Sequence, residues 1–516
     1  MAPNSTILSP VGGEETVQEQ ARSSLILNAI GFLCLLSLVS RWWHYYRRTP
    51  KVTSVGFLPI PYIGSWVAAI RFMRRPVDVV REGMAKSRNG VFRIASLSDE
   101  LILVTDKEKV AEYLRAPDSI LSMQDGANDQ QQIPYTLGYG VAYRTYHNSV
   151  VKKQVTPNIP NFSDAMVDEM AASFTEQIGK PKDWTPVALY DVTAMTVARV
   201  SNRVFVGEPY CTNVEHLRNA TDYAQAVVIS AEILRLFPEW AKGVLVKVLP
   251  VTTCMRRAMK ILGDEVTARL EGKYAGGKKP EDLIQWLIDA APPVESTPYQ
   301  IVERVMALNV ASIHTTTMTF TAALYTLGAD PEKYVDTLRE EVHRNLENGK
   351  VTHKTIQNCI HMDSFIRESA RMNVSGLGAM QRNAKQAFKF SDGTVIPVGA
   401  KLMAPTLILS RDPASYENPQ EFQGFRFVKK GDDGVPVLEK QAVTTGTDYH
   451  LYGHGRHPCP GRFFATEEMK LMFATLLLNY DMKLAPGTAP KELRIGTMAL
   501  PDTNLKVLFK ARSVDA

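Results

Sequence analysis

The sequence contains few cysteines, and no two of them lie close together. Its 516 residues include five: Cys34, Cys211, Cys254, Cys359 and Cys459. An odd number at wide spacing, without a Cys-x-x-Cys pair, argues against a disulfide framework and for a reducing compartment. Each thiol therefore has to be considered singly. A small buried side chain is the ordinary role for most of them.

Strong net charge and nucleotide-binding motifs are also lacking. The formal net charge is only +5, and no basic stretch is interleaved with aromatic residues, so we expect no nucleic-acid partner. No Gly-x-Gly-x-x-Gly motif is present, so a redox function would depend on electrons from another protein. The composition, 45% hydrophobic and 22% charged, is that of a globular chain with a large core.

One long apolar run lies near the N-terminus. It covers 17 residues, 24–40, and is interrupted by Asn28 and a few serines. That length is at the short end of the ~17–25 residues that cross a bilayer as a helix. Aromatic and basic residues follow at 41–51, which predicts that the C-terminal side lies in the cytosol. A cleaved signal peptide fits less well, because the run lacks a basic flank before it and ends in Arg-Trp-Trp.

The remaining patterns predict one mainly α-helical domain with small β-sheets. We expect a short lumenal tail (1–23), a transmembrane helix (24–40), an aromatic and basic flank with a proline hinge (41–61) and a single large domain (62–516). Helical periodicity dominates 161–363 and returns at 461–480, and the longest helix is expected over 300–327, ending at Gly328. Strand patterns occur near 90–94, 388–403 and 505–509.

The most informative segment, Tyr-Gly-His-Gly-Arg-His-Pro-Cys-Pro-Gly-Arg, surrounds Cys459. Gly453 and Gly455 permit positive φ and a close approach to a flat partner. Pro460 and Gly461 lead into a helical pattern, and proline favours the first helical position. A cysteine at a helix N-terminus is favoured as the thiolate. One thiolate does not make a zinc site, but it can be the single protein ligand of heme iron.

This segment closely resembles the heme-binding loop of the cytochrome P450 family, Phe-x-x-Gly-x-Arg-x-Cys-x-Gly. Three positions match: Gly455, Cys459 and Gly461. Tyr452 replaces the phenylalanine, and His457 replaces the arginine that binds a heme propionate in the family. Arg456 is a candidate to share that role. The resemblance implies heme b as cofactor, with Cys459 as the axial ligand of the metal, and the cytochrome P450 fold; both departures are similar to filamentous-fungal members.

The resemblance also implies a buried Glu-x-x-Arg pair before the cysteine loop. The spacing occurs six times in the chain, and only Glu368–Arg371 stands in the position that the family requires. Arg426 resembles the third partner, although the usual Pro-Glu before it is Gly-Phe here. Two guanidinium groups can satisfy one buried carboxylate, so we expect this group to stabilise the core and not to act in catalysis.

A threonine-rich stretch in the longest helix resembles the oxygen-activation motif of the family. Thr315 aligns with the threonine that organises protons near bound oxygen. Ser312 replaces a glycine and His314 replaces the usual acid. A histidine relays protons near neutral pH, or it only holds the helix in place. A packed core helix with hydroxyls bonded to its own backbone is the alternative interpretation.

Contacts to the heme propionates are less clearly marked. The family often has Trp-x-x-x-Arg where this chain has His147 and Lys152, and no tryptophan is present there. Arg382 is a further candidate, because it follows the helix that carries Glu368. Lys152 and Lys153 equally suit an acidic reductase surface.

The resemblance implies a microsomal monooxygenase. It would take electrons from an NADPH-cytochrome P450 reductase, use O2 and oxidise an apolar small molecule, with its single-pass anchor in the endoplasmic reticulum membrane. Similarity to fungal ent-kaurene oxidases and indole-diterpene monooxygenases suggests a terpenoid or meroterpenoid of secondary metabolite biosynthesis. A heme-thiolate isomerase or dehydratase that needs no reductase is the main alternative, and a non-enzymatic heme sensor is the third.

Overall fold

The computed structural model describes residues 39, 52–57, 63–374, 376–491 and 493–512. The predicted tail, almost all of the predicted transmembrane segment 24–40 and the proline hinge lie outside these residues. Across the described ranges, no helix is long and apolar enough to cross a membrane.

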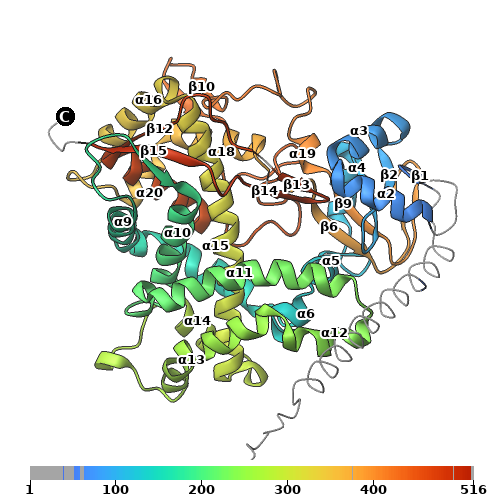
Figure 1. Ribbon diagram of the computed structural model, residues 1–516, viewed down its shortest axis with the longest axis horizontal. Coiled ribbons are helices and arrows are strands. Elements are labelled where there is room, and N and C mark those ends of the chain that lie inside the picture. Colours follow the sequence, from blue (N-terminus) through green and yellow to red (C-terminus); the bar gives the residue numbers. More distant parts are fainter. Residues whose placement is uncertain (1–38, 40–51, 58–62, 375, 492, 513–516) are drawn as a thin grey trace, which may run out of the picture.

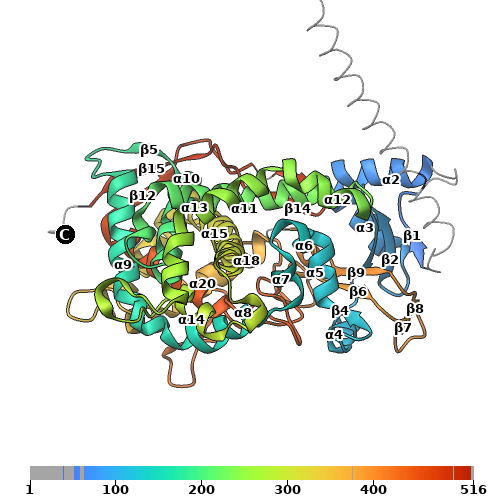
Figure 2. The ribbon, with the colours of Figure 1, turned by 90° about the horizontal axis from the view of Figure 1, so that it is seen from below.

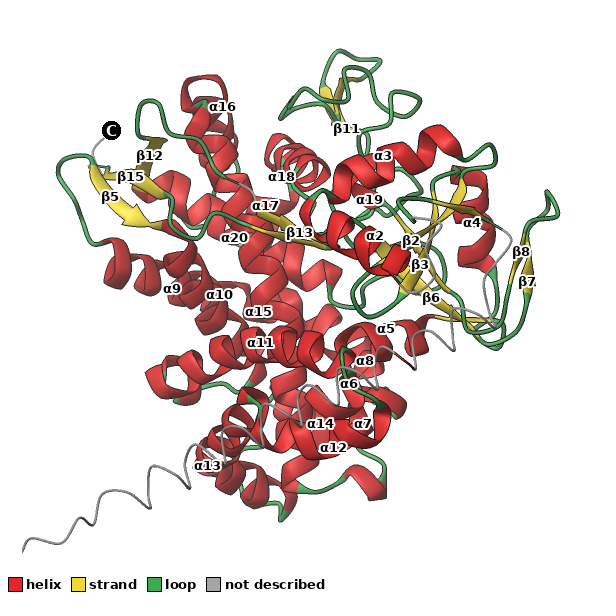
Figure 3. Cartoon of the chain, turned by 45° about the vertical axis from the view of Figure 1, so that its right-hand side comes forward, coloured by secondary structure: helices red, strands yellow, loops and turns green. Residues whose placement is uncertain are grey.

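Helices make up most of the described chain, as predicted (Figure 3). The α-helices are α2 Ile63–Arg74, α3 Pro76–Lys86, α4 Lys107–Arg115, α5 Met123–Gln131, α6 Ile133–Thr136, α7 Tyr139–Tyr143, α8 Tyr146–Val150, α9 Thr156–Ile178, α10 Leu189–Phe205, α11 Val214–Arg235, α12 Glu239–Leu245, α13 Pro250–Leu270, α14 Leu283–Ala290, α15 Pro298–Ala329, α16 Pro331–Arg344, α17 His353–Gln357, α18 Ile360–Met372, α19 Thr406–Leu409 and α20 Arg462–Asn479. A π-helix, η1 Val151–Val155, joins α8 to α9, and the 3₁₀ helices are η2 Tyr210–Thr212, η3 Val246–Val248, η4 Ala275–Gly277 and η5 Pro293–Glu295.

The strands form one six-stranded sheet and several small ones. Their bounds are β1 Thr53–Ser54, β2 Val91–Ala95, β3 Glu100–Val104, β4 Leu121–Ser122, β5 Thr185–Ala188, β6 Ala379–Ala384, β7 Phe388–Lys389, β8 Val395–Ile396, β9 Lys401–Ala404, β10 Val428–Lys430, β11 Pro436–Leu438, β12 Tyr480–Leu484, β13 Leu493–Ile495, β14 Met498–Leu500 and β15 Lys506–Ala511. The large sheet has the order β1-β2-β3-β9-β6-β4 and lies with α2, α3 and α4 at one end of the molecule (Figure 1).

Pairing in this sheet combines distant parts of the chain. β2 and β3 are antiparallel, with Phe92 opposite Leu103, whereas β3 and β9 are parallel. All five residues of β2 are buried, because the sheet is covered on both faces. The register between β6 and β9 shifts between Ala379 and Arg382, and Met380 has a positive φ of 59°. This irregularity re-aims the side chains that follow it in β6.

Helix α15 runs through the middle of the helical part (Figure 1 and Figure 2). It contacts α10, α11, α13, α18 and α20, so most of its surface is buried. Thr297 caps its first turn by accepting the Gln300 N–H, and Pro298 occupies the first helical position. The predicted stop at Gly328 is wrong by one residue, since the helix continues to Ala329. Gly328 instead allows α15 to approach β12: a Cβ there would lie 3.4 Å from the Leu484 nitrogen.

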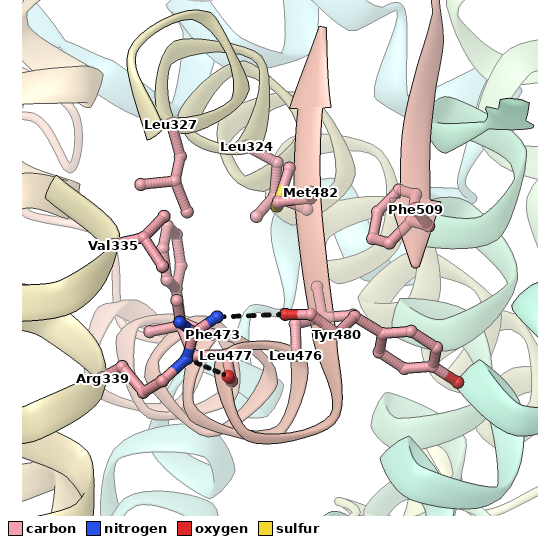
Figure 4. A pocket seen from close by; sticks show the side chains of 10 residues that line it. All are labelled: Leu324, Leu327, Val335, Arg339, Phe473, Leu476, Leu477, Tyr480, Met482 and Phe509. Atoms are coloured by element: carbon pink, nitrogen blue, oxygen red, sulfur yellow. Dashed lines mark hydrogen bonds between the residues drawn. The ribbon is translucent and has the colours of Figure 1, made fainter. Parts of the chain in front are cut away.

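A small apolar gap lies among α15, α16, α20, β12 and β15 (Figure 4). Its volume is about 10 Å³, which holds at most about one water molecule. Arg339 at its edge donates to the carbonyls of Leu477 at 2.9 Å and Tyr480 at 3.4 Å. These bonds satisfy the end of α20, so the gap is part of the packed core and not a substrate pocket.

Candidate active site

The loop around Cys459 is shaped by hydrogen bonds and two glycines. The Cys459 N–H donates to the Tyr452 carbonyl at 2.8 Å. Gly453 and Gly455 have φ values of 67° and 82°, which side chains other than glycine rarely adopt. A Cβ on Gly455 would lie 3.1 Å from the Cβ of Leu114, so glycine lets the loop pack against the end of α4.

The Cys459 thiol lies just before α20. Cys459 is exposed to solvent, but the protein atoms around its thiol partly desolvate it and raise its pKa, while the N–H groups of Gly461 and Arg462 and the charge of Arg462 act in the opposite direction. The helix begins at Arg462, one residue after the expected start at 461, and Pro460 lies just outside it. Pro460 and Gly461 form the turn that aims the first free amides at the sulfur. A cation bound to the sulfur would complete the stabilisation of the thiolate.

The residues of the Cys459 loop have different surroundings and hydrogen-bond partners. The Tyr452 hydroxyl is buried and hydrogen-bonds the Thr466 hydroxyl at 2.8 Å, which ties the loop to α20. His457 Nε2 lies 2.9 Å from a carboxylate oxygen of Asp118. The sequence did not predict this partner, because Asp118 is 339 residues away along the chain. Arg456 is exposed.

Arg382 is a buried cation at the shifted end of β6. Its side chain is 2% exposed and donates to the Gln381 carbonyl at 2.9 Å. Burial lowers the pKa of Arg382, and the nearby Tyr113 and Asp118 act to raise it. In the described part of the chain it has no carboxylate within ion-pair distance, which is unusual for a buried arginine. Such a donor is suited to an anionic group such as a heme propionate.

The two other propionate candidates lie on α8 and η1. His147 is buried, its Nδ1 atom has no hydrogen-bond partner among the described residues, and burial lowers its pKa to about 4. It is therefore neutral near pH 7 and offers a hydrogen bond but no charge. Lys152 is exposed on the π-helix η1, whose extra residue changes the direction of the side chains after α8.

Glu368, Arg371 and Arg426 come together in the core beside α18. Arg371 donates to both carboxylate oxygens of Glu368, at 2.7 and 2.8 Å, and Arg426 donates to one of them at 2.9 Å. Glu368 and Arg371 are fully buried. Arg371 also donates to the carbonyls of Ser410 and Pro419, each at 2.8 Å, so this group holds the segment that precedes the cysteine loop.

The motif on α15 presents one exposed hydroxyl in mid-helix. The Thr315 hydroxyl donates to the Ala311 carbonyl at 2.6 Å, and both residues are exposed although α15 is central. His314 is half-buried, and burial lowers its pKa. A lowered pKa makes His314 neutral near pH 7, so it does not reproduce the charge of the acid that it replaces.

A buried chain of hydroxyls leads from this motif to an acid on α20. The hydroxyls of Ser312 and Ser201 lie 2.8 Å apart, and Ser201 donates to Glu468 at 2.9 Å. Glu468 is fully buried, and burial raises its pKa to about 8. Sequence reasoning missed Ser201 and Glu468. The available signal was the position of Glu468 in α20, a helix whose residues are mostly apolar on every face.

These elements define a class: a mainly helical oxidoreductase in which a cysteine loop and a threonine-bearing central helix frame a heme. A family model described as "Cytochrome P450" matches residues 55–509, and the chain belongs to the cytochrome P450 family. Members of this family bind heme iron through a cysteine thiolate. They use O2 to oxidise a small substrate and receive electrons from a redox partner.

Several curated fungal proteins are similar over most of their length. Cytochrome P450 monooxygenase 151 of Postia placenta is 36% identical over 470 residues, 88% of this chain and 94% of that protein. Cytochrome P450 monooxygenase olcJ of Penicillium canescens is 32% identical, covering 87% of this chain and 86% of that protein. An ent-kaurene oxidase of Gibberella intermedia is 30% identical, covering 90% of this chain and 89% of that protein.

Solved structures show the same fold at low sequence identity. The retinoic acid-bound cyanobacterial CYP120A1 superposes with a TM-score of 0.65 at 17% identity and covers 90% of this chain and 99% of its own. The heme domain of cytochrome P450DA gives a TM-score of 0.67 at 17% identity, covering 90% of this chain and 98% of its own.

Proposed function

We propose that this cytochrome P450 inserts one atom of O2 into a terpenoid or meroterpenoid intermediate of fungal secondary metabolite biosynthesis. The observation that carries the proposal is the Cys459 loop, in which the thiol faces the free amides of Gly461 and Arg462. The name of the ent-kaurene oxidase relative supports a terpenoid substrate. The olcJ relative supports monooxygenase chemistry.

The residues of the loop and of β6 fit a heme. Cys459 would supply the axial thiolate, and Arg382 is the buried cation that suits a propionate. His457 and Arg456 lie in the same loop as Cys459 and would meet the second propionate, with Asp118 orienting the His457 ring. When bound, the heme supplies the iron that binds and activates O2.

Side chains of α15 and its neighbours would hold and move protons beside the heme. The Thr315 hydroxyl lies at the exposed face of the helix and is held by the Ala311 carbonyl. Because its pKa is near 8, the Glu468 carboxyl holds a proton at neutral pH, and Ser201 and Ser312 connect it to the motif. We infer that this path replaces the acid that is missing at position 314.

The electron donor and the membrane anchor both lie outside the described part of the chain in this proposal. We propose that an NADPH-cytochrome P450 reductase is the electron donor, because the chain has no dinucleotide-binding motif. We further propose that residues 24–40 anchor the protein in the endoplasmic reticulum membrane with the catalytic domain in the cytosol.

The test is turnover of a panel of terpenoid scaffolds by microsomes that contain this protein and a fungal reductase, under ¹⁸O₂. We expect a product with one labelled oxygen that forms only with NADPH. Full turnover under nitrogen without NADPH would overturn the monooxygenase proposal in favour of an isomerase or dehydratase. In the same microsomes, Cys459→Ser should abolish the CO-difference band that depends on thiolate ligation.

A further inference from the structure

A second cavity lies well away from Thr315, at the beginning of α15. Its volume is about 460 Å³, and its walls come from the α6–α7 region, α11, α13 and the first turns of α15. Figure 3 shows these helices gathered at one end of the helical part. Glu303, which lines the cavity, precedes Thr315 by 12 residues, or about 18 Å along the helix. The cavity is therefore separate from the place of oxidation.

Glu303 is the unusual feature of this cavity. Its side chain is 8% exposed, and in the described part of the chain no hydrogen bond or ion pair reaches its carboxyl group. A buried carboxylate without a partner is costly, so such groups ordinarily serve a ligand or a reaction. Burial raises the pKa of Glu303 to about 7, so the carboxyl is partly ionised at neutral pH.

Two nearby arginines do not pair with Glu303. Arg304 and Arg144 both form ion pairs with Glu295, which is fully buried. Arg304 also donates to the Arg144 carbonyl at 3.1 Å, which fixes the two arginines relative to one another. Both neighbouring arginines are thus already paired with Glu295. Neither arginine forms an ion pair with the Glu303 carboxyl group, which leaves that group available to a ligand.

The backbone over Glu303 is built to leave room for its carboxyl group. Gly138 has a φ of 105°, and a Cβ there would lie 2.0 Å from the carboxyl carbon of Glu303. Any other residue at this position would displace Glu303. Two residues on, a Cβ on Gly140 would lie 2.5 Å from a Glu295 carboxylate oxygen. Both glycines therefore hold the loop directly above the two acids.

The other walls are aromatic and apolar. Four tyrosines and two methionines line the cavity: Tyr135, Tyr139, Tyr223, Tyr299, Met255 and Met259. Tyr299 is more than half exposed, so its ring is accessible to a ligand, whereas the ring of Tyr139 already contacts Tyr143 and the Arg144 guanidinium. Aromatic faces attract organic cations, and an unpaired carboxylate adds charge complementarity. Arg256 also lines the cavity but is exposed at its rim, where solvent screens its charge.

We propose that this cavity binds an apolar small molecule that carries a protonated amine, with the ammonium group on Glu303 and the apolar body against the tyrosines and methionines. Binding here requires no turnover. The site is independent of the oxidation proposed above, and each proposal can fail without the other.

The test uses three probes with the same cage and different polar groups: 1-adamantanamine, 1-adamantanol and 1-adamantanecarboxylate. Binding is measured by calorimetry on the full-length, heme-loaded protein, with its iron saturated by imidazole so that the amine cannot ligate it. We expect the amine to bind at least about tenfold more tightly than the other two probes. The Glu303→Gln variant should lose this preference, while Glu215→Gln, an exposed acid of α11 outside the cavity, should keep it.

Two further measurements separate the proposal from a structural role of Glu303. Met259→Trp fills the cavity from its partly buried wall and should abolish binding of all three probes without loss of the heme spectrum. Amine affinity should rise with pH through about 7 in the wild type and stay level in Glu303→Gln. The charged and titratable groups around Glu303 are Arg144, Tyr223, Arg256, Glu295, Tyr299 and Arg304. Equal binding of the three probes, no binding at all, or unchanged amine affinity in Glu303→Gln would overturn the proposal.

Discussion

Three buried glutamates differ in the partners that the fold supplies. Glu368 receives hydrogen bonds from two guanidinium groups, which satisfy it as an anion. Glu468 has only a serine hydroxyl, and its pKa rises to about 8. Glu303 has neither and faces a cavity. The same side chain is thus structural in the first case, a proton holder in the second and a partly ionised carboxyl group open to ligands in the third.

Removing the charge of Glu368 should destabilise the fold. In Glu368→Gln, Arg371 remains fully buried but loses the negative charge of its partner. Breaking a buried ion pair lowers the free energy of unfolding by about 3–5 kcal/mol. Urea unfolding of the heme-loaded protein measures this loss. Glu332→Gln, at an exposed position of α16, is the matched control and should change stability by less than about 0.5 kcal/mol. A Glu368→Gln variant as stable as this control would show that the group does not hold the core.

At the scale of elements, Ser201 and its partners join three helices. Ser201 comes from α10, Ser312 from α15 and Glu468 from α20, so a chain of hydrogen bonds crosses the helical core. The loop before α20 is organised in a similar way, by the Cys459–Tyr452 backbone bond and the Tyr452–Thr466 side-chain bond. Neither arrangement follows from the periodicity of one helix, because each depends on which helices are neighbours.

Glu468 should make stability depend on pH. Its pKa is about 8 in the folded protein and about 4.5 when unfolded, so between these values the folded state binds more protons. Stability therefore falls as pH rises from about 4.5 through about 8. Glu468→Gln should remove this part of the decline, which thermal unfolding at several pH values measures.

A matched measurement tests the proton path itself. In Glu468→Gln and Ser201→Ala, we expect less product per NADPH consumed, because proton delivery to the motif is impaired. Unchanged coupling in both variants would show that the chain of hydroxyls only packs the three helices together.

At the scale of the whole molecule, the described domain and the predicted anchor have separate roles. The cytochrome P450 family model covers 55–509, which contains the cysteine loop, the motif on α15 and the cavity at Glu303. The apolar run at 24–40 precedes all of these. We therefore expect the domain to fold and bind heme without the run.

Deletion of residues 1–40 tests this division. The truncated protein should leave the membrane fraction after carbonate extraction, while the full-length chain should stay in it. Both should give the same CO-difference spectrum. A truncated protein that remains in the membrane would show that residues outside 24–40 are sufficient for attachment.

The sequence indicated the class of protein correctly, through its resemblance to the cytochrome P450 family. A cysteine between glycines and prolines before a helix, a Glu-x-x-Arg pair and a threonine-rich helix are local patterns, and local patterns are set by backbone geometry and spacing. The mainly helical fold with small sheets follows from the same periodicities. The start of α20 differs by one residue from the expected position 461, because capping depends on neighbouring residues.

Which side chains meet depends on the tertiary fold. Asp118 approaches His457, Ser201 approaches Glu468, and Gly138 closes over Glu303, although long stretches of chain separate each pair. Among the described residues, Arg382 in β6 donates to the Gln381 carbonyl and forms no ion pair, which its sequence neighbours do not predict. Burial raises the pKa of Glu468 and of Glu303, and their burial depends on packing among elements that are distant in the sequence.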